Sequence, residues 1–246
     1  MLIWAVVLCL SAVVFAIWIY EPRSFLYVFQ RLAYRVYDRQ NFLSNVSRYF
    51  PEQTRVADSI ELIRAELMAL LTDRRVPKAH EMDPLNNEIS FTQGPGWRTF
   101  YLKVYSGWFK DNCARCPYTY ELFKPMRNVL TVMFSIMEPG NVIPPHAGML
   151  RGFLRYQLPI VVPASPGCAI TVNGETRVYE AGKGFMFDDN LVHSVTNATS
   201  EYRLVLFLDI HKPANILVRA VDGFFMQLVA LSPKFRAAAG RAYKEF

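Results

Sequence analysis

The sequence predicts a mainly β fold, an antiparallel sandwich or jelly roll, with flanking helices and an apolar helix at the N-terminus. Segments of strand character follow one another between residues 97 and 211 with no helical pattern between them. The helical patterns lie outside this region, over residues 1–20, 54–71 and 215–231. Because 52% of the residues are hydrophobic, the composition excludes a disordered chain.

The N-terminal segment, residues 1–20, contains no charged side chain. About 20 apolar residues in a helix match the ~30 Å hydrocarbon core of a bilayer. A cleavable signal peptide is the rival interpretation, but no basic residue precedes the run and no small-residue cleavage site follows it. We therefore predict an uncleaved, single-pass transmembrane anchor.

Residues 21–53 form a basic juxtamembrane segment, with the arginines Arg23, Arg31, Arg35, Arg39 and Arg48. By the positive-inside rule this segment places the N-terminus outside and the rest of the chain in the cytoplasm. Residues 24–37 mix aromatic side chains with arginine. A helix here is expected to lie either along an anionic membrane surface or against the domain with its basic face in water.

The main domain is predicted over residues 54–213, with a helix followed by a β core over 97–213. Apolar residues in 54–71 recur with a spacing near 3.6, which is typical of an amphipathic helix. Residues 74–97 are rich in Pro, Asn and Gly and are expected to form a loop.

The strands of the β core are predicted one by one. Aromatic alternation marks residues 97–106, and buried apolar runs mark 129–138 and 152–162. Asn173-Gly174 signals a hairpin over 169–180, since this dipeptide favours two-residue turns. The remaining strands are expected over 182–189 and 202–211.

A C-terminal helical segment is predicted over residues 214–246. Its first part, 215–231, is strongly apolar with helical spacing, and it is expected either to cap the barrel or to touch the membrane. The four cysteines give no disulfide framework in a chain of 246 residues. Cys113 and Cys116 have zinc or redox spacing, but no second such pair exists, so we interpret them as structural or incidental.

Two of the four histidines, His146 and His193, are candidate metal ligands. Pro144-Pro145 and Gly148 place His146 at a strand edge, at the mouth of a barrel. His193 follows Phe187-Asp188-Asp189 at a loop-to-strand junction. Strands of a jelly roll meet at one mouth, so the two imidazoles are expected to lie together.

Arg203 is a candidate anion-binding residue. Period-two alternation puts it on one strand face with Val205 and Phe207, while Leu204, Leu206 and Leu208 occupy the other. Both faces are apolar, and a buried arginine keeps its charge and needs a partner. An internal Asp or Glu is one such partner. A bound dicarboxylate is the other, because guanidinium binds carboxylate through two parallel hydrogen bonds.

Two further polar residues lie inside predicted strands. Arg155 shares a face with Phe153 and Gln157, and that face also needs an anion or hydrogen-bond acceptors. Ser135 places a small hydroxyl within an otherwise apolar strand.

Together these residues resemble the aspartyl/asparaginyl β-hydroxylase family of iron(II)- and 2-oxoglutarate-dependent dioxygenases. The resemblance covers about residues 95–213 and runs, in order, through GWRTFYLKVY, CPYTYEL, FSIMEPGNVIPPHAG, LRYQLPI, EAGKGFMFDDNLVHSVTNAT and RLVLFLDIHKP.

The resemblance implies a double-stranded β-helix (a jelly-roll or cupin-like fold) that uses Fe(II), 2-oxoglutarate and O2. It implies that His146 and His193 bind the iron, and that Arg203, Ser135, Arg155 and Gln157 bind 2-oxoglutarate. No catalytic residue beyond the metal centre is implied.

This chain shares with the family the absence of a carboxylate ligand two residues after the first histidine. Most 2-oxoglutarate oxygenases have Asp or Glu there, whereas this chain has Gly148 and the family is thought to use water. The chain departs from the family at Gln157, where the family usually has histidine. An amide still donates a hydrogen bond.

The apolar N-terminus and the GWRTFYLKVY and CPYT runs are most similar to the bacterial lipid hydroxylases of this family, which act on lipid A acyl chains or ornithine lipids. This similarity implies a membrane lipid substrate, an anionic membrane surface as partner and a location at the bacterial inner membrane. No nucleic-acid partner is expected, and the oligomeric state stays open.

Two other functions remain open from the sequence. One is hydroxylation of Asp or Asn in a peptide or a carrier-bound amino acid. The HxG pattern of His146 and Gly148, with glycine in place of a carboxylate ligand, favours this function. The other is a non-enzymatic, cupin-like binding module at the membrane.

Overall fold

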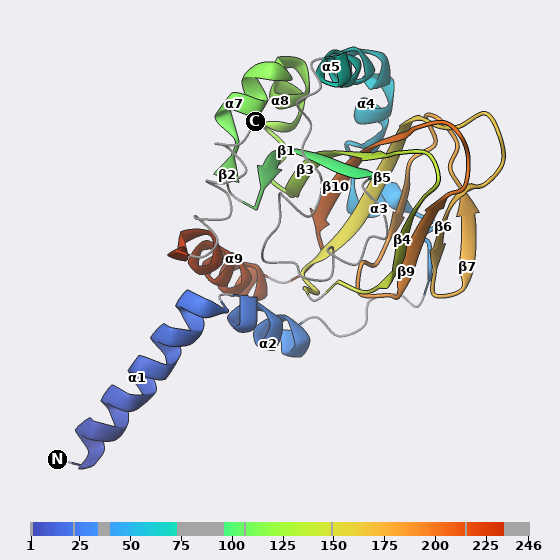
Figure 1. Ribbon diagram of the computed structural model, residues 1–246. Helices are drawn as coiled ribbons and strands as arrows, with labels where there is room; N and C mark the ends of the chain where they lie inside the picture. The colour runs from blue at the N-terminus through green and yellow to red at the C-terminus, as the bar shows by residue number, and fades with distance from the viewer. Residues whose placement is uncertain are drawn as a thin grey trace.

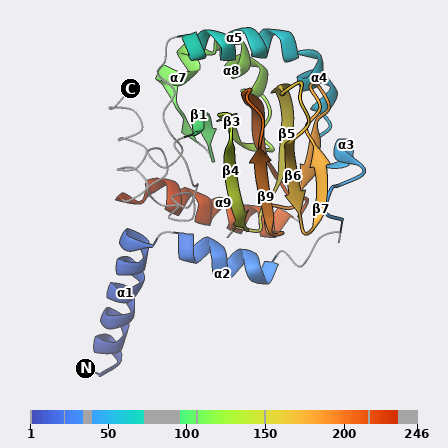
Figure 2. The same ribbon diagram turned by 45° about the vertical axis from the view of Figure 1, so that its right-hand side comes forward.

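The computed structural model describes residues 2–21, 23–33, 40–72, 96–105, 107–148, 150–214 and 216–233. Two antiparallel sheets face each other, with helices packed on one outer face and at one end (Figures 1 and 2). The mainly β prediction is therefore confirmed.

The strand order is that of a jelly roll. The larger sheet runs β2 (Gly107–Trp108), β1 (Trp97–Val104), β3 (Val129–Met137), β10 (Arg203–His211), β5 (Phe153–Val161) and β8 (Phe185–Phe187). The smaller sheet runs β4 (Asn141–His146), β9 (His193–Asn197), β6 (Cys168–Val172) and β7 (Glu175–Val178). From β3 to β6, and again from β7 to β10, successive strands alternate between the two sheets. This alternation is the connectivity of a jelly roll.

Side chains of the larger sheet alternate between two cores. The outer core joins Phe134 and Leu206 to the helices α4 (Gln53–Asp58), α5 (Ile60–Thr72), α7 (Lys110–Arg115) and α8 (Pro117–Phe123). The inner core joins Met137 and Val205 to the smaller sheet. Arg203 and Gln157, whose strands place them on this inner face, therefore lie inside the barrel.

Several local predictions are confirmed and others need correction. Asn173 and Gly174 both have positive φ, 47° and 85°, and join β6 to β7 as a two-residue turn. The helix predicted over 54–71 is divided by Ser59 into α4 and α5. Helices α3 (Val46–Tyr49), α7 and α8 are additional to the predicted elements. The predicted loop over 74–97 lies mostly outside the described residues.

Helix α1 (Leu2–Tyr20) points away from the barrel (Figures 1 and 2). Among the residues with described positions, no helix is both long enough and apolar enough to span a membrane. The anchor predicted over residues 1–20 stays a prediction.

Helices α2 (Arg23–Ala33) and α9 (Ile216–Leu231) pack together at one end of the barrel. Met226 and Val229 of α9 form a small core with Leu130, Leu150 and Phe153. The predicted C-terminal helix therefore packs on the domain. Of the predicted helix over 24–37, residues 34–37 lie outside the described part of the chain.

Candidate active site

His146 and His193 lie side by side at one end of the barrel. They are register partners on the neighbouring strands β4 and β9, and their ring centroids are 4.2 Å apart. Each Nδ1 lies 2.8 Å from the carbonyl oxygen two residues earlier, Pro144 O for His146 and Leu191 O for His193. With Nδ1–H donating to these carbonyls, each Nε2 keeps a free lone pair, which is the arrangement of a metal-binding imidazole.

The His193 imidazole is buried, with 4% of the residue exposed. Burial, assisted by nearby His146 and Arg155, lowers the pKa of His193 to about 3. The ring is therefore neutral at physiological pH, as a metal ligand must be. The described residues contain no group of three or more His, Cys, Asp and Glu side chains placed to hold a metal ion together.

A carboxylate lies beside this pair without coming from the HxG segment. Asp189 Oδ1 is 3.4 Å from His193 Nε2, and the backbone N–H of Gly148 donates to the Asp189 carbonyl at 2.7 Å. A Cβ at position 148 would overlap Asp189 Oδ2. Gly148 is thus required by the close approach of Asp189.

Arg155 holds this carboxylate in place. Its Nη1 pairs with Asp189 Oδ1, and its Nε donates to Asp209 Oδ1 at 3.2 Å. Its guanidinium also stacks over Phe207, 4.2 Å from the ring centroid. Arg155, which the resemblance assigns to 2-oxoglutarate, is therefore engaged with two carboxylates of the chain itself.

Arg203 lies deeper in the barrel and is 1% exposed. Its Nη1 donates to Tyr179 Oη at 3.3 Å and its Nη2 to Ser135 Oγ at 3.1 Å. Its buried Nε has no hydrogen-bond partner among the residues whose positions are described. No ion pair joins Arg203 to a carboxylate of the described residues, so an internal Asp or Glu from this part of the chain is excluded as its partner.

The groups around Arg203 are polar and ordered by hydrogen bonds. Ser135 Oγ also accepts from Trp97 Nε1 at 3.0 Å, which leaves its own proton to donate. Tyr179 Oη donates to Gln157 Oε1 at 2.9 Å. Burial raises the pKa of Tyr179 to about 12, so the phenol stays protonated. Arg203, Ser135 and the Gln157 amide together line a candidate anion-binding site.

The structure thus brings the six predicted residues into two neighbouring groups inside one barrel. In the first group, His193 lies against His146 and beside Asp189, which pairs with Arg155. In the second group, Arg203 donates to Ser135 and Tyr179, and Tyr179 donates to Gln157. Sequence reasoning gave no role to Asp189, Asp209, Tyr179 and Trp97. The signal for Asp189 is its place four residues before a candidate ligand, and Tyr179 gives no signal beyond an aromatic residue at the end of a hairpin.

Residues 57–213 match the family described as aspartyl/asparaginyl β-hydroxylase. The chain is 32% identical over 186 residues to the ornithine lipid ester-linked acyl 2-hydroxylase of Rhizobium tropici, covering 75% of this chain and 66% of that protein. It is 27% identical over 192 residues to the aspartate β-hydroxylase domain-containing protein 2 of Xenopus tropicalis, covering 72% and 51%. The chain spans about half to two thirds of the length of these relatives.

Among solved structures, a prolyl-4-hydroxylase of Pseudomonas putida is similar with a TM-score of 0.43 and 15% identity, over 64% of this chain and 88% of that one. A cupin domain of Schizosaccharomyces pombe Cnp3 is similar with a TM-score of 0.33 and 12% identity, over 49% and 68%.

Proposed function

The chain belongs to the aspartyl/asparaginyl β-hydroxylase family, and from this premise we propose that it is an Fe(II)- and 2-oxoglutarate-dependent dioxygenase. Its proposed reaction is hydroxylation of an unactivated C–H bond in the acyl chain of a membrane lipid, of the ornithine lipid or lipid A type.

The donor set fits iron. The two imidazoles come from adjacent strands, and their Nδ1 atoms lie against backbone carbonyls, which leaves each Nε2 to bind a metal. The Asp189 carboxylate beside them adds a negative charge that favours a cation at this place. His146 and His193 would therefore hold the metal. Bound iron and 2-oxoglutarate would supply the activation of O2 that an unactivated C–H bond requires.

The observation that carries the proposal is Arg203 inside the barrel, which has no carboxylate partner among the described residues. A buried guanidinium without a counter-ion is costly, so the fold is complementary to an anion at this point. The distal carboxylate of 2-oxoglutarate would accept from Arg203 Nε and from the Ser135 hydroxyl. Gln157, fixed by Tyr179, would add a neutral donor through its amide.

The chain's own residues would bind, orient and exclude water. Arg203 and Ser135 select a dicarboxylate, and Arg155 keeps Asp189 beside the histidines. The apolar inner core, which includes Phe185 and Phe187, keeps the interior dry.

The lipid substrate is supported by the Rhizobium tropici relative, an ornithine lipid ester-linked acyl 2-hydroxylase. As part of the proposal, the chain is attached to the bacterial inner membrane through residues 1–20, and its catalytic domain lies in the cytoplasm against an anionic lipid surface. Fractionation of cells that express the full chain tests this location.

Purified full-length protein with Fe(II), 2-oxoglutarate and O2 tests the reaction. We expect succinate to form and lipids from a strain lacking the gene to gain one oxygen atom, as measured by mass spectrometry. A His193→Ala variant should form neither product.

Other results of this experiment would support the two alternative functions. Hydroxylation of an Asp- or Asn-containing peptide without any change in the lipids would indicate the peptide hydroxylase. Absence of succinate with every acceptor, and identical behaviour of His193→Ala, would indicate a binding module.

A further inference from the structure

A stripe of apolar side chains runs along the outer side of α9. Leu217, Val221, Phe224 and Leu231 are 74%, 40%, 59% and 48% exposed, and their spacing places them on one helix face. Contiguous apolar surface of this kind marks an interaction site.

The opposite side of α9 is fixed by specific contacts. Asp222 accepts a hydrogen bond from Gln30 Nε2 at 2.6 Å, and the Phe225 ring packs on Phe29 with centroids 5.5 Å apart. Met226 and Val229 lie in the core beneath. Because a buried carboxylate and two buried apolar residues face the domain, α9 cannot turn its stripe inward.

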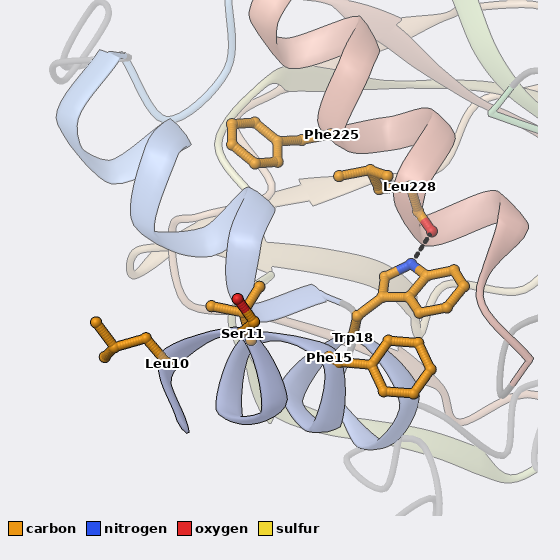
Figure 3. A pocket seen from close by; sticks show the side chains of 7 residues that line it. Leu10, Ser11, Phe15, Trp18, Phe225 and Leu228 are labelled. Carbon is orange, nitrogen blue, oxygen red and sulfur yellow. Dashed lines mark hydrogen bonds between the residues drawn. The ribbon is translucent and has the colours of Figure 1, made fainter. Parts of the chain in front are cut away.

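A groove continues this surface toward α1. It has a volume of about 590 Å³ and is lined by Leu10, Ser11, Val14, Phe15, Trp18, Phe225 and Leu228 (Figure 3). Trp18 Nε1 donates to the Leu228 carbonyl at 2.8 Å, which joins the two helices at one end of the groove. Ser11 supplies the remaining polar side chain of the lining, so an apolar occupant fits. The volume lies within the ~300–1,000 Å³ of ordinary small-ligand sites.

The exposed charges of α2 and α9 are basic. Arg31 of α2 and Arg219 of α9 are exposed. The only acidic residue within α2 and α9 is Asp222, and it is buried. An apolar stripe on a pair of helices whose exposed charges are cationic, with no exposed carboxylate on either helix, is complementary to anionic lipid headgroups above hydrocarbon.

This surface lies at the end of the barrel that carries the histidines. Phe153, which packs against α9, is the register partner of His211 at the end of β10. The next residue, Lys212, pairs with Asp188 at 2.7 Å, directly beside Asp189. Whatever covers α9 therefore lies near the proposed iron site.

We propose that the Leu217–Leu231 stripe of α9 lies in the headgroup–acyl boundary of a lipid bilayer, and that one lipid acyl chain occupies the groove between α1 and α9. This inference rests on the proposed lipid hydroxylase function and adds a second membrane contact, which would bring the histidine end of the barrel to the bilayer.

The test uses the full chain in vesicles of phosphatidylethanolamine and phosphatidylglycerol. In a Cys9→Ala background, which removes the exposed thiol, Phe224→Cys carries an environment-sensitive fluorophore. The matched control is Val178→Cys on β7, a position that is 58% exposed and away from α9. Lipids with a nitroxide on the acyl chain act as quenchers.

We expect the label at position 224 to be quenched several-fold more strongly than the label at 178. Equal quenching of the two labels would overturn the proposal. In a second experiment, Phe224→Cys carries a nitroxide spin label instead of the fluorophore. Strong dipolar coupling between two such labels would also overturn the proposal, because a second copy of the chain would then cover the stripe.

This readout does not depend on turnover. Lipid hydroxylation with an unquenched label at 224 would reject the docking surface and keep the proposed function. A quenched label at position 224 without hydroxylation of any lipid would support the docking surface and reject the proposed lipid hydroxylase function.

Discussion

The Asp189 carboxylate lies in the space that a side chain at residue 148 would occupy. Gly148 N donates to the Asp189 carbonyl at 2.7 Å, and a Cβ at 148 would overlap Asp189 Oδ2. Gly148 stands where most 2-oxoglutarate oxygenases have a carboxylate ligand. Its lack of a side chain leaves space for the carboxylate of Asp189, from the Phe187-Asp188-Asp189 segment.

Gly148→Ala is expected to displace Asp189 and to destabilise the fold by about 1–3 kcal/mol, the usual cost of overpacking. Urea denaturation measures the change, and iron titration should show weaker binding. Gly107→Ala is the control, because its Cβ would meet only Val104 O at an ordinary 3.5 Å. Wild-type stability and iron binding in Gly148→Ala would contradict the assigned packing.

Arg203→Met should abolish 2-oxoglutarate binding without destabilising the ligand-free protein, since it removes a buried charge that has no counter-ion in the described part of the chain. With 2-oxoglutarate at about 100 times its Kd, ligand binding should raise the free energy of unfolding of the wild-type protein by about 2.7 kcal/mol. Thermal denaturation with and without 2-oxoglutarate measures this gain, which Arg203→Met should lose. The exposed Arg177→Met control should keep it. A strongly destabilised ligand-free Arg203→Met variant would point to an internal partner instead.

Arg155→Met is expected to lower the free energy of unfolding by about 3–5 kcal/mol, because two buried carboxylates lose their shared cation. Denaturant titration of the ligand-free protein is the measurement. Gln157→Leu serves as the comparison, since it removes an amide near Arg203 and leaves both carboxylates paired. Unchanged stability of Arg155→Met together with a raised KM for 2-oxoglutarate would instead place Arg155 on the co-substrate.

Stability of the metal-free protein should fall as the pH falls from about 6.5 toward 3. The pKa of His193 is lowered to about 3 in the folded state, so the unfolded chain takes up a proton first, near its ordinary pKa of about 6.5. Thermal midpoints across this range measure the effect. His193→Gln should flatten the dependence, and an equal slope in that variant would assign it to other groups.

Gln30→Leu should destabilise the protein by about 1–3 kcal/mol, because Asp222 and the Arg151 N–H lose a buried partner. The exposed Arg31→Ala change on the same helix is the control, and chemical denaturation compares the two. Equal stability of both variants would show that the Gln30 contacts contribute little.

Much of the barrel could be predicted because its strands alternate regularly. The pattern around Arg203 correctly gave two apolar faces, and Asn173-Gly174 gave the turn. Strands β4 and β9 were harder to recognise, since β4 contains Pro144-Pro145 and its register with β9 is irregular between Ile143 and His146.

The candidate site could be predicted only as residue types, because a single sequence does not tell which polar groups satisfy one another. Arg155 and Arg203 have equivalent positions in apolar strands, yet Arg155 pairs with two carboxylates and Arg203 with none of the described ones. Long-range contacts such as Tyr179 to Gln157 decide this difference, and neither residue carries a local signal for it.

The hydrogen bond from Gln30 to Asp222 makes the two ends of the chain parts of one folding unit. A shortened protein that begins at residue 40, or at the predicted domain boundary of 54, would keep α9 but lose its covering helix. Asp222 would then face water-filled space beside Gly152, and Phe225 would be uncovered. Anyone who wishes to crystallise the barrel should therefore retain residues 23–33, or remove both helices together.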